Sequence, residues 1–90
     1  MAVTVKIPTH LRAATDGEST AMVDGATVGE VLDALYERYV ELRSRIAEDG
    51  GLRRFVNVYV GEEDIRFLEG LETPVSDGDE VTILPAVAGG

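Results

Sequence analysis

The chain has 90 residues, enough for one domain with a single modest core. Its 17 acidic and 8 basic residues give a net charge of -9, the opposite of the balance that phosphate contacts with nucleic acid require. There is no cysteine and one histidine, which excludes disulfides, thiolate metal sites and a cysteine nucleophile. The sequence shows neither a membrane-length apolar stretch nor a signal peptide, so we expect a cytoplasmic protein that binds neither membrane nor nucleic acid.

The first quarter of the chain predicts two strands that pair as a hairpin. Apolar and polar residues alternate over residues 3–7, as in a half-buried strand, and Pro8 ends the ladder because it has no N–H to donate. Residues 13–18 have the composition of a turn. A second strand is then expected over residues 19–23, paired back on the first.

The middle of the chain predicts a helix. Thr27 and Glu30 have the spacing of a capping box at its start. Two alternatives fit its far end, an unbroken helix to about Ala47 or a break near Val40, with Asp49-Gly50-Gly51 closing it. The apolar residues recur with the 3.6-residue period of one buried face, at Val28, Val31, Leu32, Leu35, Tyr39, Leu42 and Ile46.

After the helix, the strongest strand signal covers residues 55–60, which are rich in β-branched and aromatic residues. Residues 61–64 are expected to form a polar turn, and residues 65–68 a short strand or bridge. The Asp-Gly pair within residues 76–79 predicts a tight turn. A last strand is expected over residues 80–84.

The predicted order β-β-α-β-(β)-β indicates an α+β roll in which one main helix covers a mixed four- to five-stranded sheet. We expect the first and last strands to lie side by side, parallel, at the centre of the sheet. We assign residues 1–86 to this domain and residues 87–90 to a flexible C-terminal tail.

The sequence gives little support for an enzyme active site. A hydrolytic triad needs a base, and His10, the single imidazole, is expected in a surface loop. The carboxylates of residues 62–64 lie in a domain too small for a deep cleft and are expected to form a solvated acidic loop. Nucleotide-binding motifs are absent from the sequence. We therefore expect no catalytic residue, no metal site and no bound cofactor.

A carrier of an activated group is the better class. An acyl carrier needs a serine in an Asp-Ser-Leu setting, which Ser19, Ser44 and Ser76 lack. A lipoyl or biotinyl carrier needs a lysine at a hairpin tip, whereas Lys6 lies within the first strand. The attachment point that remains is the α-carboxylate of Gly90.

Chemistry at this carboxylate requires activation, because a carboxylate is a poor electrophile. The most economical route is an acyl-adenylate made with ATP by a separate enzyme. A sulfur donor that displaces AMP would leave a thiocarboxylate, and an amine would leave an isopeptide bond. The segment Val87-Ala88-Gly89-Gly90 is expected to thread into the channel of such an enzyme, because glycine adds no bulk beside the reacting carbon.

The run SDGDEVTILPAVAGG, residues 76–90, resembles the C-terminal signature of the ThiS/MoaD family of ubiquitin-like β-grasp sulfur carriers. The combination of the Asp-Gly-Asp-Glu-Val turn, the strand, the proline and the terminal Ala-Gly-Gly is specific, whereas Gly-Gly alone is not. The resemblance covers the whole chain. Residues 55–60, 63–64 and 66–67 further resemble the CysO-type carriers of cysteine biosynthesis.

The resemblance implies a β-grasp fold and a partner, similar to ubiquitin-activating enzymes, that uses Mg-ATP to adenylate Gly90. In CysO-type systems the thiocarboxylate sulfur attacks an activated serine on a PLP-dependent cysteine synthase, and a metalloprotease releases the new cysteine. In related systems the sulfur enters molybdopterin, thiamin or sulfur-containing natural products. Which acceptor applies stays open.

A partner surface is predicted near the tail. Leu84, with exposed members of Phe55 and Tyr59 on the outer face of the sheet, would form a small apolar patch. The alternative, that these side chains simply fill the core or the strands, stays open. Two other functions also stay open: a ubiquitin-like modifier conjugated to lysines through Gly90, and an interaction domain whose tail is incidental.

Overall fold

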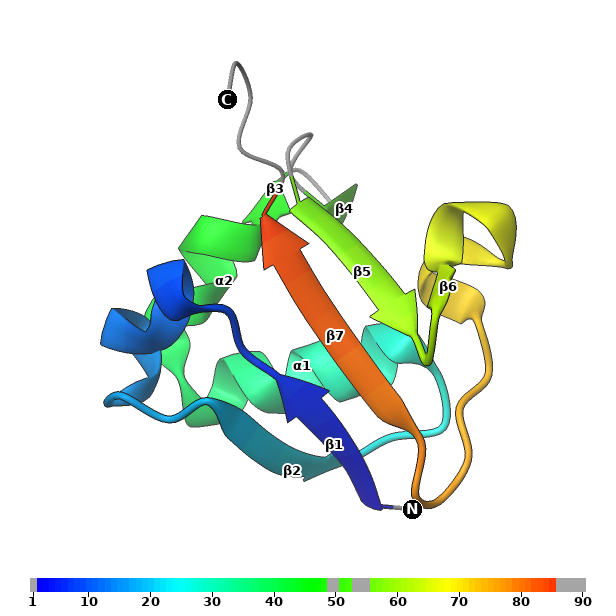
Figure 1. The fold of residues 1–90 in the computed structure, drawn as a ribbon, viewed down its shortest axis with the longest axis horizontal. Helices are drawn as coiled ribbons and strands as arrows, with labels where there is room; N and C mark the ends of the chain where they lie inside the picture. Colours follow the sequence, from blue (N-terminus) through cyan, green and yellow to red (C-terminus); the bar gives the residue numbers. More distant parts are fainter. Residues whose placement is uncertain (1, 49–50, 53–55, 86–90) are drawn as a thin grey trace.

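The protein is a mixed sheet with two helices packed on one face, as the computed structural model of residues 2–48, 51–52 and 56–85 shows (Figure 1). The strand order across the five-stranded sheet is β2-β1-β7-β5-β6. The predicted α+β roll is therefore confirmed, with five strands in its main sheet. The strands are β1 (Ala2–Lys6), β2 (Thr20–Asp24), β5 (Val56–Val60), β6 (Glu63–Asp64) and β7 (Glu80–Pro85).

The first and last strands lie side by side at the centre, as predicted. β1 and β7 run parallel, with Val5 opposite Val81, and β5 pairs with the other edge of β7 in antiparallel orientation. β2 pairs with β1 as the expected antiparallel hairpin. Because β7 has a partner on both edges, its backbone groups are held along most of its length, and its end has a defined place in the fold.

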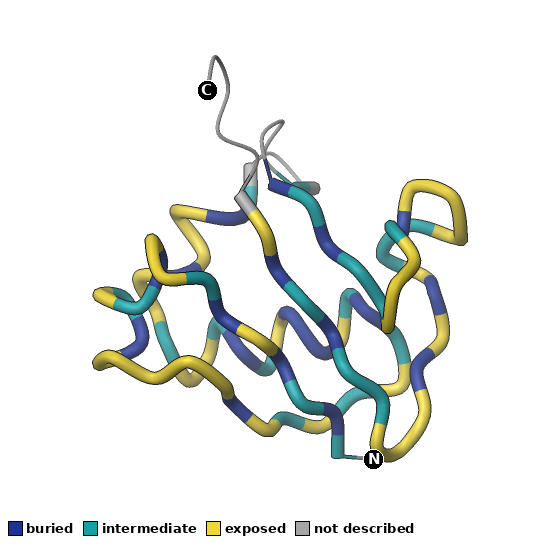
Figure 2. Tube along the Cα trace, viewed as in Figure 1, coloured by how far each residue is buried: buried dark blue, intermediate teal, exposed yellow. Residues whose placement is uncertain are grey.

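Alternation along the strands divides the sheet into a buried and an exposed face. Every second residue of β1, β5 and β7 points toward the helices, because successive side chains of a strand point to opposite faces. Figure 2 shows the resulting alternation of buried and more exposed positions along these strands. The inward-facing residues form the core together with the helices, and they are Val3, Val5, Val56, Val58, Val81 and Ile83.

The helical region begins as predicted and breaks once. The Thr27 hydroxyl accepts a hydrogen bond from the Glu30 N–H (3.2 Å), and the Glu30 carboxylate accepts one from the Ala26 N–H (3.0 Å). α1 (Val28–Arg38) ends at Tyr39, whose φ of -128° and ψ of 88° are not helical, and α2 (Val40–Ile46) follows. The predicted break near Val40 is confirmed. The change of direction lets α2 bury Leu42 and Ile46 against the same core.

Two glycines are required by their surroundings. A Cβ on Gly25 would lie 2.7 Å from the backbone nitrogen of Val31, so a side chain there would collide with the start of α1. Gly78 has a φ of 89°, which favours glycine in the tight turn before β7. The turn predicted over residues 76–79 is confirmed, with the Asp79 N–H bonded to the Ser76 carbonyl (2.9 Å).

The helical region ends within one residue of the predicted Ala47, but the predicted glycine cap is wrong at Gly51. α2 ends at Ile46, and Ala47 is already extended, with a φ of -99° and a ψ of 149°. Ala47 begins β3 (Ala47–Glu48), which pairs with β4 (Gly51–Leu52) in a second, two-stranded sheet. Of the predicted closing segment Asp49-Gly50-Gly51, Asp49 and Gly50 lie outside the residues that the structure describes, and Gly51 lies in β4, paired with Glu48.

Three short 3₁₀ helices form in segments where no helix was predicted. η1 (Thr9–Thr15) occupies most of the connection between β1 and β2. The short strand expected over residues 65–68 is wrong, because η2 (Ile65–Phe67) forms there and the strand pairing falls on β6 before it. Asp64 causes the change, since its carboxylate caps η2 by accepting from the Arg66 N–H (2.8 Å). η3 (Gly70–Glu72) follows.

The boundary predicted between residues 86 and 87 lies outside the residues that the structure describes. Within the described part of the chain, neither helix is long and apolar enough to cross a membrane.

Candidate functional site

The outer face of the sheet, opposite the helices, carries the candidate site. Lys6 of β1 and Tyr59 of β5 both lie beside Thr82 of β7. At the next outward position of β7, two residues after Thr82, Leu84 lies opposite Asn57. These positions belong to three different strands, and their side chains share a face because each occupies an outward position of its strand.

The predicted apolar patch is placed in part. Leu84 is 45% exposed at the end of β7, and Tyr59 is half-buried on the same outer face. The buried Val58 and Ile83 fix this orientation, since they point inward from the neighbouring positions. Phe55, and the tail segment Val87, Ala88, Gly89 and Gly90, lie outside the residues that the structure describes.

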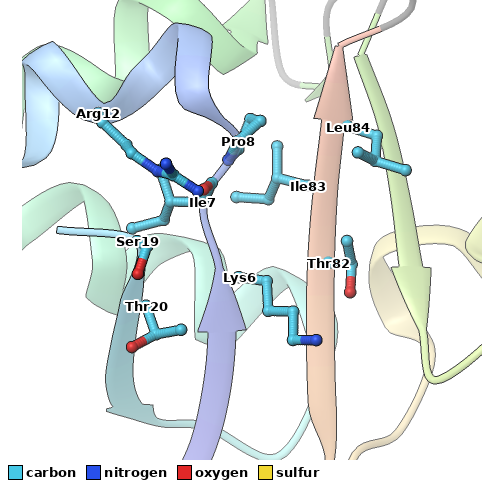
Figure 3. Close-up of a pocket in the computed structure, with 9 residues that line it drawn as sticks. All are labelled: Lys6, Ile7, Pro8, Arg12, Ser19, Thr20, Thr82, Ile83 and Leu84. Atoms are coloured by element: carbon cyan, nitrogen blue, oxygen red, sulfur yellow. The ribbon is translucent and has the colours of Figure 1, made fainter. Parts of the chain in front are cut away.

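A hollow of about 340 Å³ lies beside Leu84. Nine residues line it, drawn from β1, η1, β2, β7 and the short connections between them (Figure 3). Its walls mix apolar groups with the hydroxyls of Thr20 and Thr82 and the cations of Lys6 and Arg12. The hollow therefore offers a partner both apolar contact and positive charge, close to the point where β7 leads into the C-terminal segment.

The cations in this hollow are held by contacts with the fold. The Lys6 ammonium lies 3.4 Å from the Glu80 carboxylate, a bridge between β1 and β7. The Arg12 Nε–H donates to the Ile7 carbonyl (3.3 Å). Both groups stand out on a chain with a net charge of -9. They favour a partner that brings an acidic group to this end of the sheet.

A second polar link lies on the other side of Leu84. The Arg66 guanidinium donates to the Asn57 side-chain oxygen, and its Nε lies 3.8 Å from the Asp64 carboxylate. Asn57 lies directly opposite Leu84. Arg66 therefore joins η2 to the outer face of the sheet at the level of Leu84.

Two of the candidate chemistries considered from the sequence can be placed in the structure. His10 is exposed on η1, as expected for a surface position. Among residues 2–48, 51–52 and 56–85, His, Asp and Glu side chains form no group that could hold a metal ion. In the acidic loop at residues 62–64, Asp64 is occupied as the cap of η2.

The helix layer contains a tyrosine, Tyr36, whose pKa is shifted. Burial raises the pKa of the Tyr36 phenol to about 12, the Asp33 carboxylate adds to the rise, and the Arg43 guanidinium opposes it. Tyr36 lies on α1, among the residues packed against the core. This shift therefore concerns stability rather than the outer face of the sheet.

The central parallel strands, the helix layer on one face and the open outer face define a ubiquitin-like β-grasp domain. The chain belongs to the ThiS family, whose model matches residues 5–90. It is 50% identical, over an alignment of 93 residues spanning all of both chains, to the sulfur carrier protein CysO of Mycobacterium tuberculosis. It is 43% identical over 67 residues to the small archaeal modifier protein 3 of Haloferax volcanii, covering 74% of this chain and 73% of that protein.

Solved structures agree with the sequence comparison. A chain in the crystal structure of the Amycolatopsis orientalis BexX/CysO complex superposes with a TM-score of 0.93 and 53% identity, over 99% of this chain and 100% of that one. The chain is therefore CysO-like in sequence and fold, within a family that includes sulfur carriers.

Sequence reasoning missed the polar part of this surface. Alternation had placed Lys6 and Thr82 on outward positions of two strands, but only the observed register sets them side by side. Arg12 reaches the hollow because η1 folds back beside the end of β1. The Asn57–Arg66 link depends on η2, which the sequence had predicted as a strand.

Proposed function

We propose that this protein is a sulfur carrier that works through the α-carboxylate of Gly90. The observation that carries the proposal is the family match, which continues through the last strand to residue 90. The full-length similarity to a sulfur carrier protein supports it further. The folded domain presents the carboxylate to enzymes and does no chemistry itself.

The chemistry takes two steps on a partner enzyme. The Gly90 carboxylate oxygen attacks the α-phosphorus of Mg-ATP, pyrophosphate leaves, and an acyl-adenylate forms. A sulfide or persulfide sulfur then attacks the carbonyl carbon, and AMP leaves with the electron pair of the broken C–O bond. With sulfide the product is a thiocarboxylate directly, while a persulfide needs a thiol to reduce the acyl disulfide.

The outer face of the sheet is the docking surface in this proposal. An enzyme that takes Gly89 and Gly90 into its channel must hold the domain near the end of β7. Leu84 and Tyr59, with Phe55, supply apolar contacts there, and the hollow beside Leu84 accepts a side chain of the partner. The solved BexX/CysO complex is consistent with a carrier of this kind binding a protein partner.

The thiocarboxylate then donates its sulfur to a second enzyme. The similarity to CysO favours cysteine biosynthesis, with a PLP-dependent synthase as acceptor and a metalloprotease that releases the product. The chain is also similar to a molybdopterin synthase sulfur carrier subunit. A molybdopterin, thiamin or natural-product pathway is therefore the alternative destination.

The test is the intact mass of the protein after incubation with a cognate adenylating enzyme, Mg-ATP and sulfide. We expect a gain equal to the replacement of one oxygen by sulfur, dependent on ATP. Gly90→Ala is expected to reduce this gain strongly with an unchanged melting temperature, because the added methyl crowds the reacting carbon. An unmodified mass with an enzyme that modifies a known carrier would refute the proposal.

A role as a protein modifier is the second candidate. It is favoured by the similarity to a small archaeal modifier protein, and it would use the same adenylate with a lysine amine in place of sulfur. Immunoblots of cells that express the tagged protein would then show covalent ladders that vanish when Gly89 and Gly90 are deleted. Ladders unaffected by that deletion would exclude conjugation through Gly90.

A further inference from the structure

Phe67 is the most exposed large apolar side chain among the described residues, with 86% of its surface open to solvent. It lies in η2, at the β6 edge of the sheet (Figures 1 and 2). Leu68 beside it is 39% exposed. Two adjacent apolar side chains left in water form a small patch of the kind that a partner covers.

The backbone around Phe67 is held in place. Ile65, two residues before, is buried in the core with 2% of its surface exposed. Asp64 caps η2, and the Leu68 N–H donates to the Ile65 carbonyl (3.0 Å). Arg66 is bound to Asn57 and Asp64. Since its neighbours are fixed, Phe67 can bind a partner with little loss of backbone entropy, as anchor residues of interfaces do.

The charge around Phe67 indicates the chemistry of the partner. Besides Asp64, four acidic residues lie within five positions of Phe67 in the sequence, and none of the four has a basic partner within the described part of the chain. A complementary surface therefore has an apolar pocket with lysine and arginine at its rim. A second copy of this chain would bring the same acidic residues against themselves. The four residues are exposed, and they are Glu62, Glu63, Glu69 and Glu72.

The position of Phe67 connects it with the candidate docking surface. Arg66 contacts Asn57, and Asn57 lies opposite Leu84 at the end of β7. A protein that covers Leu84 and extends over Asn57 meets η2 next. Phe67 is thus the next residue after Arg66, the side chain that joins η2 to the strand position opposite Leu84.

We propose that Phe67 is an anchor for the adenylating enzyme, and that it inserts into an apolar pocket with a basic rim on that enzyme. This inference rests on the proposed function for the identity of the partner. Phe67, with Leu68 beside it, provides the apolar contact, and the acidic residues around it select the basic rim. Leu84 and Phe67 then hold the domain at two points while the tail enters the channel.

The test compares Phe67→Ala with Val40→Ala, because Val40 is 78% exposed on α2, in the helix layer. The affinity of each carrier for the adenylating enzyme is measured by calorimetry without ATP, and adenylation by ATP–pyrophosphate exchange. We expect Phe67→Ala to raise Kd and KM about tenfold with little change in kcat. Val40→Ala should leave Kd, KM and kcat at their wild-type values.

The role of the acidic residues near Phe67 is tested by a matched pair of charge reversals. Glu69→Lys is expected to weaken binding severalfold and to reduce its dependence on salt. Glu37→Lys changes the net charge by the same amount on the exposed side of α1. It should have a smaller effect if the charge must lie beside Phe67, and equal effects of the two reversals would contradict a local basic rim.

The outcomes separate this inference from the proposed function. Wild-type levels of binding and exchange in Phe67→Ala would overturn the anchor and leave the carrier function intact. Weaker binding of Phe67→Ala to an enzyme that binds the protein without adenylating it would support the anchor and contradict adenylation. An enzyme that adenylates a known carrier but neither binds nor adenylates this protein would overturn both.

Discussion

The two faces of β7 differ sharply although they belong to one strand of six residues. Val81 and Ile83 point inward and are fully buried. Thr82 and Leu84 point outward, and Leu84 is 45% exposed. The inward face joins the core that stabilises the fold, and the outward face shapes the candidate docking surface. A strand with a period of two can serve both purposes, because changes on one face leave the other largely in place.

The largest effect is expected from Ile83→Ala. Removing the buried methyl and methylene groups of Ile83 from the core should lower the free energy of unfolding by about 3 kcal/mol. Urea denaturation followed by circular dichroism measures the change. Thr82→Ala is the matched control on the outward face, and a loss as large as that of Ile83→Ala would erase the difference between the two faces.

The second prediction concerns the outward face of β7, where a substitution should change binding rather than stability. Leu84→Ala should raise the KM of an adenylating enzyme for the carrier about tenfold, since it removes an apolar contact at the root of the C-terminal segment. Its free energy of unfolding should stay within about 0.5 kcal/mol of wild type, because nearly half of the residue's surface is already open to solvent. An unchanged KM together with a large loss of stability would make Leu84 a core residue instead.

The third prediction concerns the helix layer that covers the inward face. Thr27→Ala removes the hydroxyl that accepts from the Glu30 N–H. The expected loss is about 1 kcal/mol, the usual cost of removing an N-cap. Thermal denaturation measures it, with Thr27→Ser as the control that keeps the acceptor. Binding of the adenylating enzyme should be unaffected, and a weaker complex would mean that the helix layer contributes to docking.

The smallest effect is a pH dependence. The pKa of Tyr36 is raised to about 12, so its contribution to stability is fully present below pH 10 and is lost as the pH rises toward 12. Since the side chain is half-exposed, solvent screening reduces the expected loss to about 1 kcal/mol or less. Urea denaturation at pH 9 and at about pH 11.5 should show a larger decrease for wild type than for Tyr36→Phe. Equal decreases in the two proteins would show that Tyr36 does not contribute to the pH dependence of stability.

Local patterns predicted the parts of the fold that depend on short-range physics. The capping box at Thr27 and Glu30 and the alternation of the first strand both appear in the structure. The Asp-Gly turn before β7 also appears, with Gly78 in the conformation that this turn requires. These features succeed because each is satisfied by bonds within a few residues or by one repeating pattern of burial.

Elsewhere, pairing and packing in the folded chain overrode the local signals that the residue types gave. The glycine at position 51 suggested a helix cap, but it pairs with Glu48 in a strand. Residues 65–68 suggested a strand, but the Asp64 cap and the burial of Ile65 make a 3₁₀ helix there. In both places the residue types allow more than one conformation, and the strand pairing, the cap or the burial of a side chain decides between them.

The sequence by itself determined the β-grasp class, the two faces of each strand and the family. These follow from the periodicity of apolar residues and from a specific C-terminal motif, which can both be read within short stretches of the chain. The tertiary structure alone decided which outward residues are neighbours. Lys6 meets Thr82 through the parallel register of β1 and β7, and Arg66 reaches Asn57 through η2. The first pair is more than 70 positions apart along the chain and the second is nine apart. No periodicity along the chain encodes either contact, because register and packing set them.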